Sequence, residues 1–270
     1  MFTKLLKHEW RATKEMLGTV CLVCLGASLL GGLTMRYLMW ASTVETSPNA
    51  IVVLSVLGLT AAIIAVAITG VAALFLYISR FYKSRFTDEG YLTFTLPVNT
   101  HQNLLASMAN TAIGMVIVFF VICACLGLWL MIGLSGIPEV WTLFREKLPE
   151  LWHSFVYTIK TIPWEYVGLF LLNTLTGGAC ALVVLMLSVT IGSILARKHK
   201  VLVAVGVYYG INVALSMVGT TTMALQVFPY GGEAQTVVRV FCSSALLTAV
   251  VAVAGYFLMY WLIDKRLNLN

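Results

Sequence analysis

Six long apolar runs, each almost free of charged residues, constrain this chain more than any other feature of its sequence. They lie at residues 17–37, 51–79, 104–134, 166–196, 201–226 and 238–263. A helix rises about 1.5 Å per residue, so about 20 apolar residues cross a hydrocarbon core of roughly 30 Å. The runs are too continuous for the alternating pattern of an outer-membrane barrel. The sequence therefore predicts an all-α integral membrane protein with six transmembrane helices.

The composition excludes the alternative of a water-soluble globule. Hydrophobic residues make up 60% of the 270 residues and charged residues only 10%, and the mean hydropathy is +0.93. That is too little charged surface to cover a soluble domain of this length.

The distribution of basic residues predicts the orientation in the membrane. An even number of spans puts both termini on one side. Only five of the 17 Lys and Arg residues fall on the other side: Arg36, Arg145, Lys147, Lys160 and Arg239. The positive-inside rule then places both termini and the loop at 80–103 in the cytoplasm. The net charge of +6 mostly reflects this topology, so we expect no nucleic-acid partner.

The first sixteen residues predict an amphipathic helix in the inner membrane interface, in contact with lipid. Apolar side chains recur there at helical spacing, and Lys and Arg occupy much of the remaining circumference. The expected membrane-interface anchors are Phe2, Leu5, Leu6 and Trp10. A simple basic flank of the first span is the alternative. The chain thus divides into an interfacial helix at 1–16 and a transmembrane domain at 17–270.

The largest segment expected on the external side is 135–165. It contains Pro138 and Pro163 near its ends and Pro149 between them, and apolar residues recur every three or four positions. This pattern predicts two short interfacial helices on the outer leaflet, or a small lid over a pathway between spans. The sequence leaves both open.

The interiors of the spans argue against several classes of protein. No Asp, Glu, Lys or His falls in the middle of a span, which argues against a carrier driven by protons or sodium ions. We expect no catalytic residue, no metal site and no redox role for the six cysteines, so the chain is not expected to be an enzyme. The central polar residues are neutral, and the candidate pathway residues are Asn173, Thr176 and Asn212.

The loop at 80–103 reads RFYKSRFTDEGYLTFTLPVNTHQN and is both charged and rich in aromatic residues. It places several apolar side chains on the water side of the membrane, where another protein is expected to cover them. The chain has no GxxxxGK motif followed by Ser or Thr. If ATP drives this protein, a different polypeptide must bind the nucleotide.

Two stretches, MFTKLLKHEWRAT at the N-terminus and RFYKSRFTDEGYLTFTLPVNTHQNLLASM after the second span, resemble the ABC type-2 permease subunits of exporters from Gram-positive bacteria. The resemblance implies a multi-pass protein of the bacterial cell membrane that pairs with a second permease subunit, identical or related. It also implies separate ABC ATPase subunits that bind ATP and Mg²⁺. In this family the loop between the second and third spans forms the coupling helix. The implied docking residues are Asp88, Glu89, Gly90, Tyr91, Leu92, Phe94 and Leu96.

One feature departs from that family. Many type-2 permeases place their larger external element between the fifth and sixth spans, whereas here it follows the third. The expected function is outward movement of an amphipathic or lipophilic substrate, with an antimicrobial peptide as the leading candidate. The alternative is a membrane scaffold or sensor that transports nothing and docks a cytoplasmic partner through the same loop.

Overall fold

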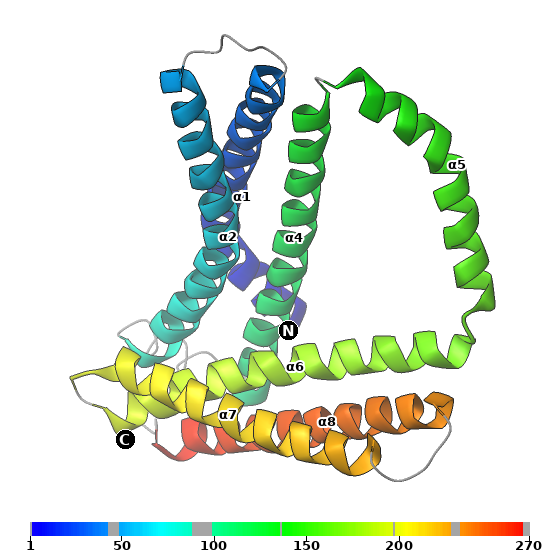
Figure 1. Ribbon diagram of the computed structural model, residues 1–270. Coiled ribbons are helices and arrows are strands. Elements are labelled where there is room, and N and C mark those ends of the chain that lie inside the picture. Colours follow the sequence, from blue (N-terminus) through cyan, green and yellow to red (C-terminus); the bar gives the residue numbers. More distant parts are fainter. Residues whose placement is uncertain are drawn as a thin grey trace. The chain divides into compact units, whose positions relative to one another are not determined.

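The computed structural model describes residues 2–42, 49–87, 99–135, 137–196, 198–227 and 233–266, and its secondary structure there is entirely helical (Figure 1). The helices are α1 (Phe2–Ala41), α2 (Asn49–Phe86), α4 (Thr100–Leu134), α5 (Pro138–Thr161), α6 (Trp164–Leu195), α7 (Lys200–Val227) and α8 (Glu233–Arg266).

Six of these helices are long and apolar enough to cross a membrane, and α5 is the exception. Each of the six contains one of the predicted runs, so the all-helical fold class and the six membrane-length helices are confirmed. The helices extend beyond the predicted runs. In particular, α1 continues without interruption from Phe2 to Ala41, so the predicted helix at 1–16 and the first span form one helix. The interfacial position of its first sixteen residues stays a prediction.

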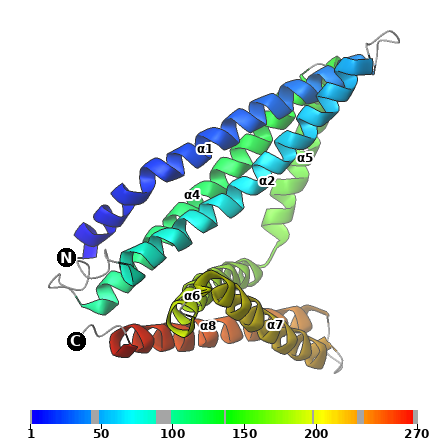
Figure 2. The same cartoon turned by 90° about the vertical axis from the view of Figure 1, so that its left-hand side faces the viewer.

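The chain divides into two compact units, one of which comprises residues 7–77 and 110–159. In this unit α1, α2 and α4 run side by side (Figure 2). Their core contains two apolar clusters, one around Cys24, Ala62 and Trp129 and one around Leu17 and Tyr77.

Small residues allow the three helices of this unit to approach closely. A Cβ atom at Gly31 of α1 would lie 2.9 Å from both the Ala62 Cβ of α2 and the Trp129 ring of α4. A polar contact also joins α1 to α4, because the Asn110 side chain donates a hydrogen bond to the Thr13 hydroxyl at 3.3 Å. Hydrogen bonds of this kind between helices are favoured where water is excluded.

The other unit contains the described residues of 1–6, 78–109 and 160–270, and α6 is its central helix. α6 packs extensively against α8 and also against α7. Gly192 lets α6 and α7 meet near their connection, since a Cβ there would lie 2.6 Å from the Ala204 Cβ. The last turns of α2 and the first turns of α4 also belong to this unit, which gives them packing partners on α6 and α8.

The segment at 135–165 differs from the prediction of two short helices. α5 is a single helix of 24 residues with Pro149 inside it. Proline removes one backbone hydrogen bond and bends a helix, but it does not have to end one. Figure 1 shows α5 bending along its length.

Candidate functional site

The predicted docking residues Asp88, Glu89, Gly90, Tyr91, Leu92, Phe94 and Leu96 lie outside the described residues. The structure does describe the two helix ends that flank them, the last turns of α2 up to Phe86 and the first turns of α4 from Thr100. Residues 88–98 are joined to the rest of the chain through these two helix ends. A partner that moved this segment would therefore act on whatever the two helix ends pack against.

A buried arginine joins the two helix ends. The Arg85 side chain on α2 is only 3% exposed. One terminal nitrogen, Nη2, donates a hydrogen bond to the backbone carbonyl of Asn103 on α4 at 3.1 Å. The other, Nη1, donates to the Ser107 hydroxyl on α4 at 3.4 Å and to the Ser84 hydroxyl at 3.3 Å. The planar guanidinium group can donate hydrogen bonds to several acceptors at once from three nitrogen atoms. Lysine has only one donor nitrogen and is less suited to such a site.

An aromatic ring also contacts this guanidinium group. The central carbon of the Arg85 guanidinium lies 4.4 Å from the centroid of the Phe81 ring, one turn earlier on α2. A cation over an aromatic face is attracted by the ring quadrupole, and more strongly where water is excluded. Phe81 is itself 2% exposed. We call Arg85, Ser84, Phe81, Asn103 and Ser107 the arginine junction.

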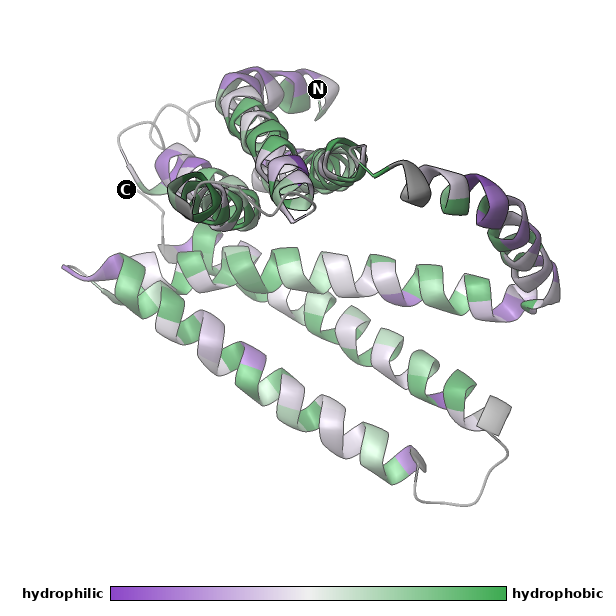
Figure 3. Ribbon diagram, turned by 45° about the horizontal axis from the view of Figure 1, so that its top comes forward, coloured by the Kyte–Doolittle hydropathy of each residue, from purple (hydrophilic) through white to green (hydrophobic). Residues whose placement is uncertain are grey.

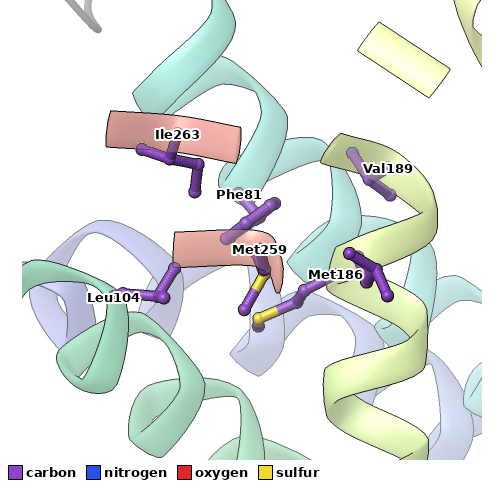
Figure 4. Close-up of a cluster of buried hydrophobic side chains, with 7 residues drawn as sticks. Phe81, Leu104, Met186, Val189, Met259 and Ile263 are labelled. Carbon is purple, nitrogen blue, oxygen red and sulfur yellow. The ribbon is translucent and has the colours of Figure 1, made fainter. Parts of the chain in front are cut away.

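The arginine junction shares Phe81 with a buried apolar cluster, shown in part in Figure 4. Figure 4 shows Met186 of α6 and Met259 of α8 pointing toward each other near Phe81. The cluster consists of Phe81, Leu104, Met186, Leu187, Val189, Met259 and Ile263. Since these residues come from α2, α4, α6 and α8, the helix ends beside residues 88–98 are packed against two further membrane-length helices.

Three polar contacts that involve tyrosine rings or hydroxyls add to this packing. The His101 ring on α4 stacks on the Tyr260 ring of α8, with a centroid distance of 3.7 Å and an interplanar angle of 12°. His101 Nδ1 lies 3.0 Å from the Tyr256 hydroxyl, also on α8. Lys200, the first residue of α7, donates a hydrogen bond to the Tyr82 hydroxyl of α2 at 3.3 Å. Thus α4 is attached to α8, and α2 to the start of α7.

The candidate pathway residues do not form one group of direct contacts. Asn173 of α6 donates a hydrogen bond to the Ser244 hydroxyl of α8 at 2.9 Å, so it links two helices. Thr176 donates to backbone carbonyls of its own helix. Asn212 is exposed on α7 and donates to the carbonyl of Tyr208 on the same helix. Asn173 and Thr176 are therefore neighbours on α6, while the side chain of Asn212 forms its hydrogen bond within α7.

The four predicted interface anchors differ in exposure along α1. Phe2 is exposed, whereas Leu5 and Leu6 are half-buried. Trp10 is also half-buried and packs against the apolar cluster that contains Leu17 and Tyr77. Part of the Trp10 ring therefore contacts protein.

Sequence reasoning did not identify the arginine junction. Arg85 was counted only as one of the basic residues that set the orientation, because a charge at the end of a span usually lies in water. The partial signal in the sequence was the spacing of Phe81 and Arg85, which places both on one face of α2. Nothing in the local sequence indicates that Asn103 and Ser107 would meet that face.

Within the described ranges, no group of three or more His, Cys, Asp or Glu side chains could hold a metal ion, and the six cysteines are free thiols. No protein-family model, no curated protein and no solved structure matches this chain. Function therefore has to be inferred from the residues and their geometry.

Proposed function

We propose that this chain is the permease subunit of an ABC exporter, with both termini in the cytoplasm. It moves an amphipathic or lipophilic substrate outward, and an antimicrobial peptide is the leading candidate. Separate ATPase subunits bind ATP and Mg²⁺ and dock on Asp88, Glu89, Gly90, Tyr91, Leu92, Phe94 and Leu96. The cycle is one of alternating access, driven by movement of the docked ATPases.

The arginine junction is the observation that carries this proposal. A subunit docked on residues 88–96 pulls on α2 and α4 together, because Arg85 of α2 is hydrogen-bonded to Asn103 and Ser107 of α4. The same helix ends pack against α6 and α8. Burying a cation costs free energy unless its hydrogen bonds are made, so the junction is better suited to holding two helices in register than to simple packing.

The exposure of α7 supports a second permease subunit as partner. In the most apolar stretch of α7 the described part of the chain buries no residue. Gly206 and Gly210 stand four residues apart there, and a Cβ at either position would meet nothing within 4 Å. Small residues at this spacing let helices from different subunits approach closely. The second subunit is identical to this chain or related to it.

The docking proposal is tested by copurification. A gene for an ATPase with a nucleotide-binding loop is expected beside the gene for this chain, and the two proteins are co-expressed. Glu89→Arg and Phe94→Asp each greatly reduce the ATPase recovered with the chain, because they reverse a charge or place one in an apolar contact. The matched control is Lys198→Glu, a charge reversal in the connection between α6 and α7, which leaves recovery unchanged. Normal recovery with both loop variants would refute the docking assignment.

Transport is tested separately in proteoliposomes that contain the copurified complex. ATP-dependent movement of a candidate peptide or lipid is expected, and it disappears when the ATPase is inactivated. Protection of cells that persists with an inactive ATPase would instead favour a scaffold or sensor that transports nothing.

A further inference from the structure

The helix α5 has a surface that the described residues of its own unit leave exposed. Every described side chain from Trp141 to Thr161 is exposed except Val156, which is half-buried. The exposed apolar residues on this helix are Trp141, Leu143, Phe144, Leu148, Leu151, Trp152, Phe155, Tyr157 and Ile159. A continuous apolar surface of this extent is not stable in water and indicates a binding surface.

Seven of these nine side chains lie on one face of the helix, and Leu143 and Tyr157 lie outside it. At about 100° per residue, Phe144, Leu148, Leu151 and Phe155 fall within roughly 60° of one another around the helix axis, and Trp141, Trp152 and Ile159 extend the same face. Figure 3 shows hydrophilic turns along α5, whereas hydrophobic colour dominates α6 and α8. The helix is therefore amphipathic, although it is as long as a membrane span.

The charges on α5 are ordered relative to that face. Arg145 and Lys147 project near its two edges, while Glu146 and Glu150 project roughly opposite to its centre. Lys147 forms an ion pair with Glu150 at 2.9 Å. Cations at the edges can extend their apolar stems along a membrane surface and place their charges among lipid phosphates, with the acidic groups left in water. A layer of zwitterionic phospholipid headgroups complements this arrangement.

The net charge of α5 supports the same partner. Arg145, Lys147 and Lys160 are balanced by Glu139, Glu146 and Glu150, so the helix carries three positive and three negative formal charges. A helix that depended on anionic lipid would carry an excess of cations. Binding here rests on burial of the apolar face.

The chain holds both ends of α5 close to a bilayer. α4 ends at Leu134 and α5 begins at Pro138, while α5 ends at Thr161 and α6 begins at Trp164. Both neighbours are long and apolar enough to cross a membrane. The short connections at 135–137 and 162–163 reach at most about 15 Å each, because an extended chain spans no more than ~3.6 Å per residue. The apolar face of α5 thus lies within reach of the lipid surface from both ends.

From these observations we infer that α5 lies in the plane of the lipid surface, with the face around Leu148 and Phe155 inserted at the boundary between headgroups and acyl chains. In the proposed orientation this is the external leaflet. The inference goes beyond the proposed transport function and does not depend on an ATPase. The sequence predicts either an interfacial segment or a lid at 135–165. The inference chooses the interfacial role, with lipid as the partner of the apolar face.

The test measures the surroundings of spin labels on the full chain in phosphatidylcholine nanodiscs. The six native cysteines are replaced by Ala, and single labels are attached through Leu148→Cys, Phe155→Cys, Glu146→Cys or Glu150→Cys. Labels at 148 and 155 should collide readily with oxygen, which dissolves in lipid, and poorly with a water-soluble nickel chelate. Labels at 146 and 150, as matched controls on the opposite face, should show the reverse.

Two results would overturn the inference. Labels at 148 and 155 that collide with the nickel chelate as readily as those at 146 and 150 would place the face in water. Labels at 148 and 155 shielded from both reagents would mean that protein covers it. A repeat with phosphatidylglycerol added should give the same pattern, and a pattern that arises only with the anionic lipid would contradict the charge argument.

A second measurement avoids replacing the cysteines. The intrinsic tryptophan fluorescence of the otherwise unchanged chain is quenched by lipids brominated near the headgroup end of the acyl chain. The double variant Trp141→Tyr and Trp152→Tyr should lose a strongly quenched part of the emission. If the lost part is instead resistant to the brominated lipid, α5 does not lie in the lipid surface.

Discussion

At the scale of single residues, Arg85 stands out because its charged side chain is buried at the end of a membrane-length apolar helix. Its guanidinium group donates hydrogen bonds to Ser84, Ser107 and the Asn103 carbonyl and lies over the Phe81 ring, and all four partners belong to one unit of the chain. Two of those hydrogen bonds reach α4, so they join the helix end before the segment that is proposed to dock the ATPase to the helix end after it. Arg85 therefore fixes the spacing of the two helices at that point.

Replacing Arg85 is expected to loosen this spacing. In Arg85→Met the Asn103 carbonyl loses its charged donor, and hydrogen bonds to charged groups contribute about 1.5–3 kcal/mol each. Arg85→Lys keeps the charge but serves fewer acceptors. Both variants should lower the thermal unfolding midpoint in detergent, with Lys intermediate, and both should reduce substrate-stimulated ATPase activity of the complex.

The matched control is Lys83→Met, which removes an exposed cation from the same helix end. It should leave both the unfolding midpoint and the ATPase activity close to those of the unaltered chain. If Arg85→Met behaves like Lys83→Met, the junction neither stabilises the helix ends nor transmits movement.

At the scale of helices, one close contact of α2 with α4 requires a glycine. A Cβ at Gly114 of α4 would overlap the hydroxyl and ring of Tyr77 of α2. Tyr77 is buried, so its ring has little room to move away. Gly114 thus allows the ring to rest directly on the backbone of α4.

Gly114→Ala is expected to destabilise the protein although alanine is the better helix former. Inserting a methyl group into a packed contact typically costs about 1–3 kcal/mol, which exceeds the ~1 kcal/mol that alanine contributes to helix propensity. Gly127→Ala on the same helix is the control, because a Cβ there meets nothing within 4 Å. Thermal unfolding should show a lower midpoint for Gly114→Ala and an unchanged or higher one for Gly127→Ala. Equal midpoints would contradict the described contact.

The helices were largely predictable from sequence, whereas their contacts were not. An uninterrupted apolar run of about 20 residues is long enough to cross the hydrocarbon core of a bilayer. Six membrane-length helices could therefore be predicted without any knowledge of packing. The single helix α5 was missed because Pro149 was treated as a break, and α1 was divided at residue 16 where the composition changes. Both decisions used local composition, which does not reveal whether backbone hydrogen bonds continue across a position.

The candidate site was predictable only in part. The unusual composition of 80–103 identified the loop, but Arg85 meets Asn103 and Ser107 at sequence separations of 18 and 22 residues. Such contacts depend on how two helices are rotated about their axes. A nearly uniform apolar circumference gives little information on that rotation, since α2 and α4 have no strongly polar face along most of their length. The same reasoning explains why His101 was not linked to Tyr260.

At the scale of the whole molecule, the proposed orientation follows from six membrane-length helices and from the placement of basic residues. It requires that α5 and the connection between α6 and α7 lie on opposite sides of the membrane, because α6 alone separates them. The two segments offer matched exposed positions, Glu150 on the polar side of α5 and Lys198 between α6 and α7.

Labelling from outside intact cells should distinguish the two segments. In a chain whose native cysteines are replaced by Ala, Glu150→Cys should react with a membrane-impermeant maleimide added to intact cells. Lys198→Cys should react only after the membrane is permeabilised. The reverse pattern would mean that the chain is inserted in the opposite orientation, with residues 80–103 outside the cell and out of reach of any ATPase. Reaction of both positions in intact cells would show that α6 does not cross the membrane, because a single crossing must separate its two ends.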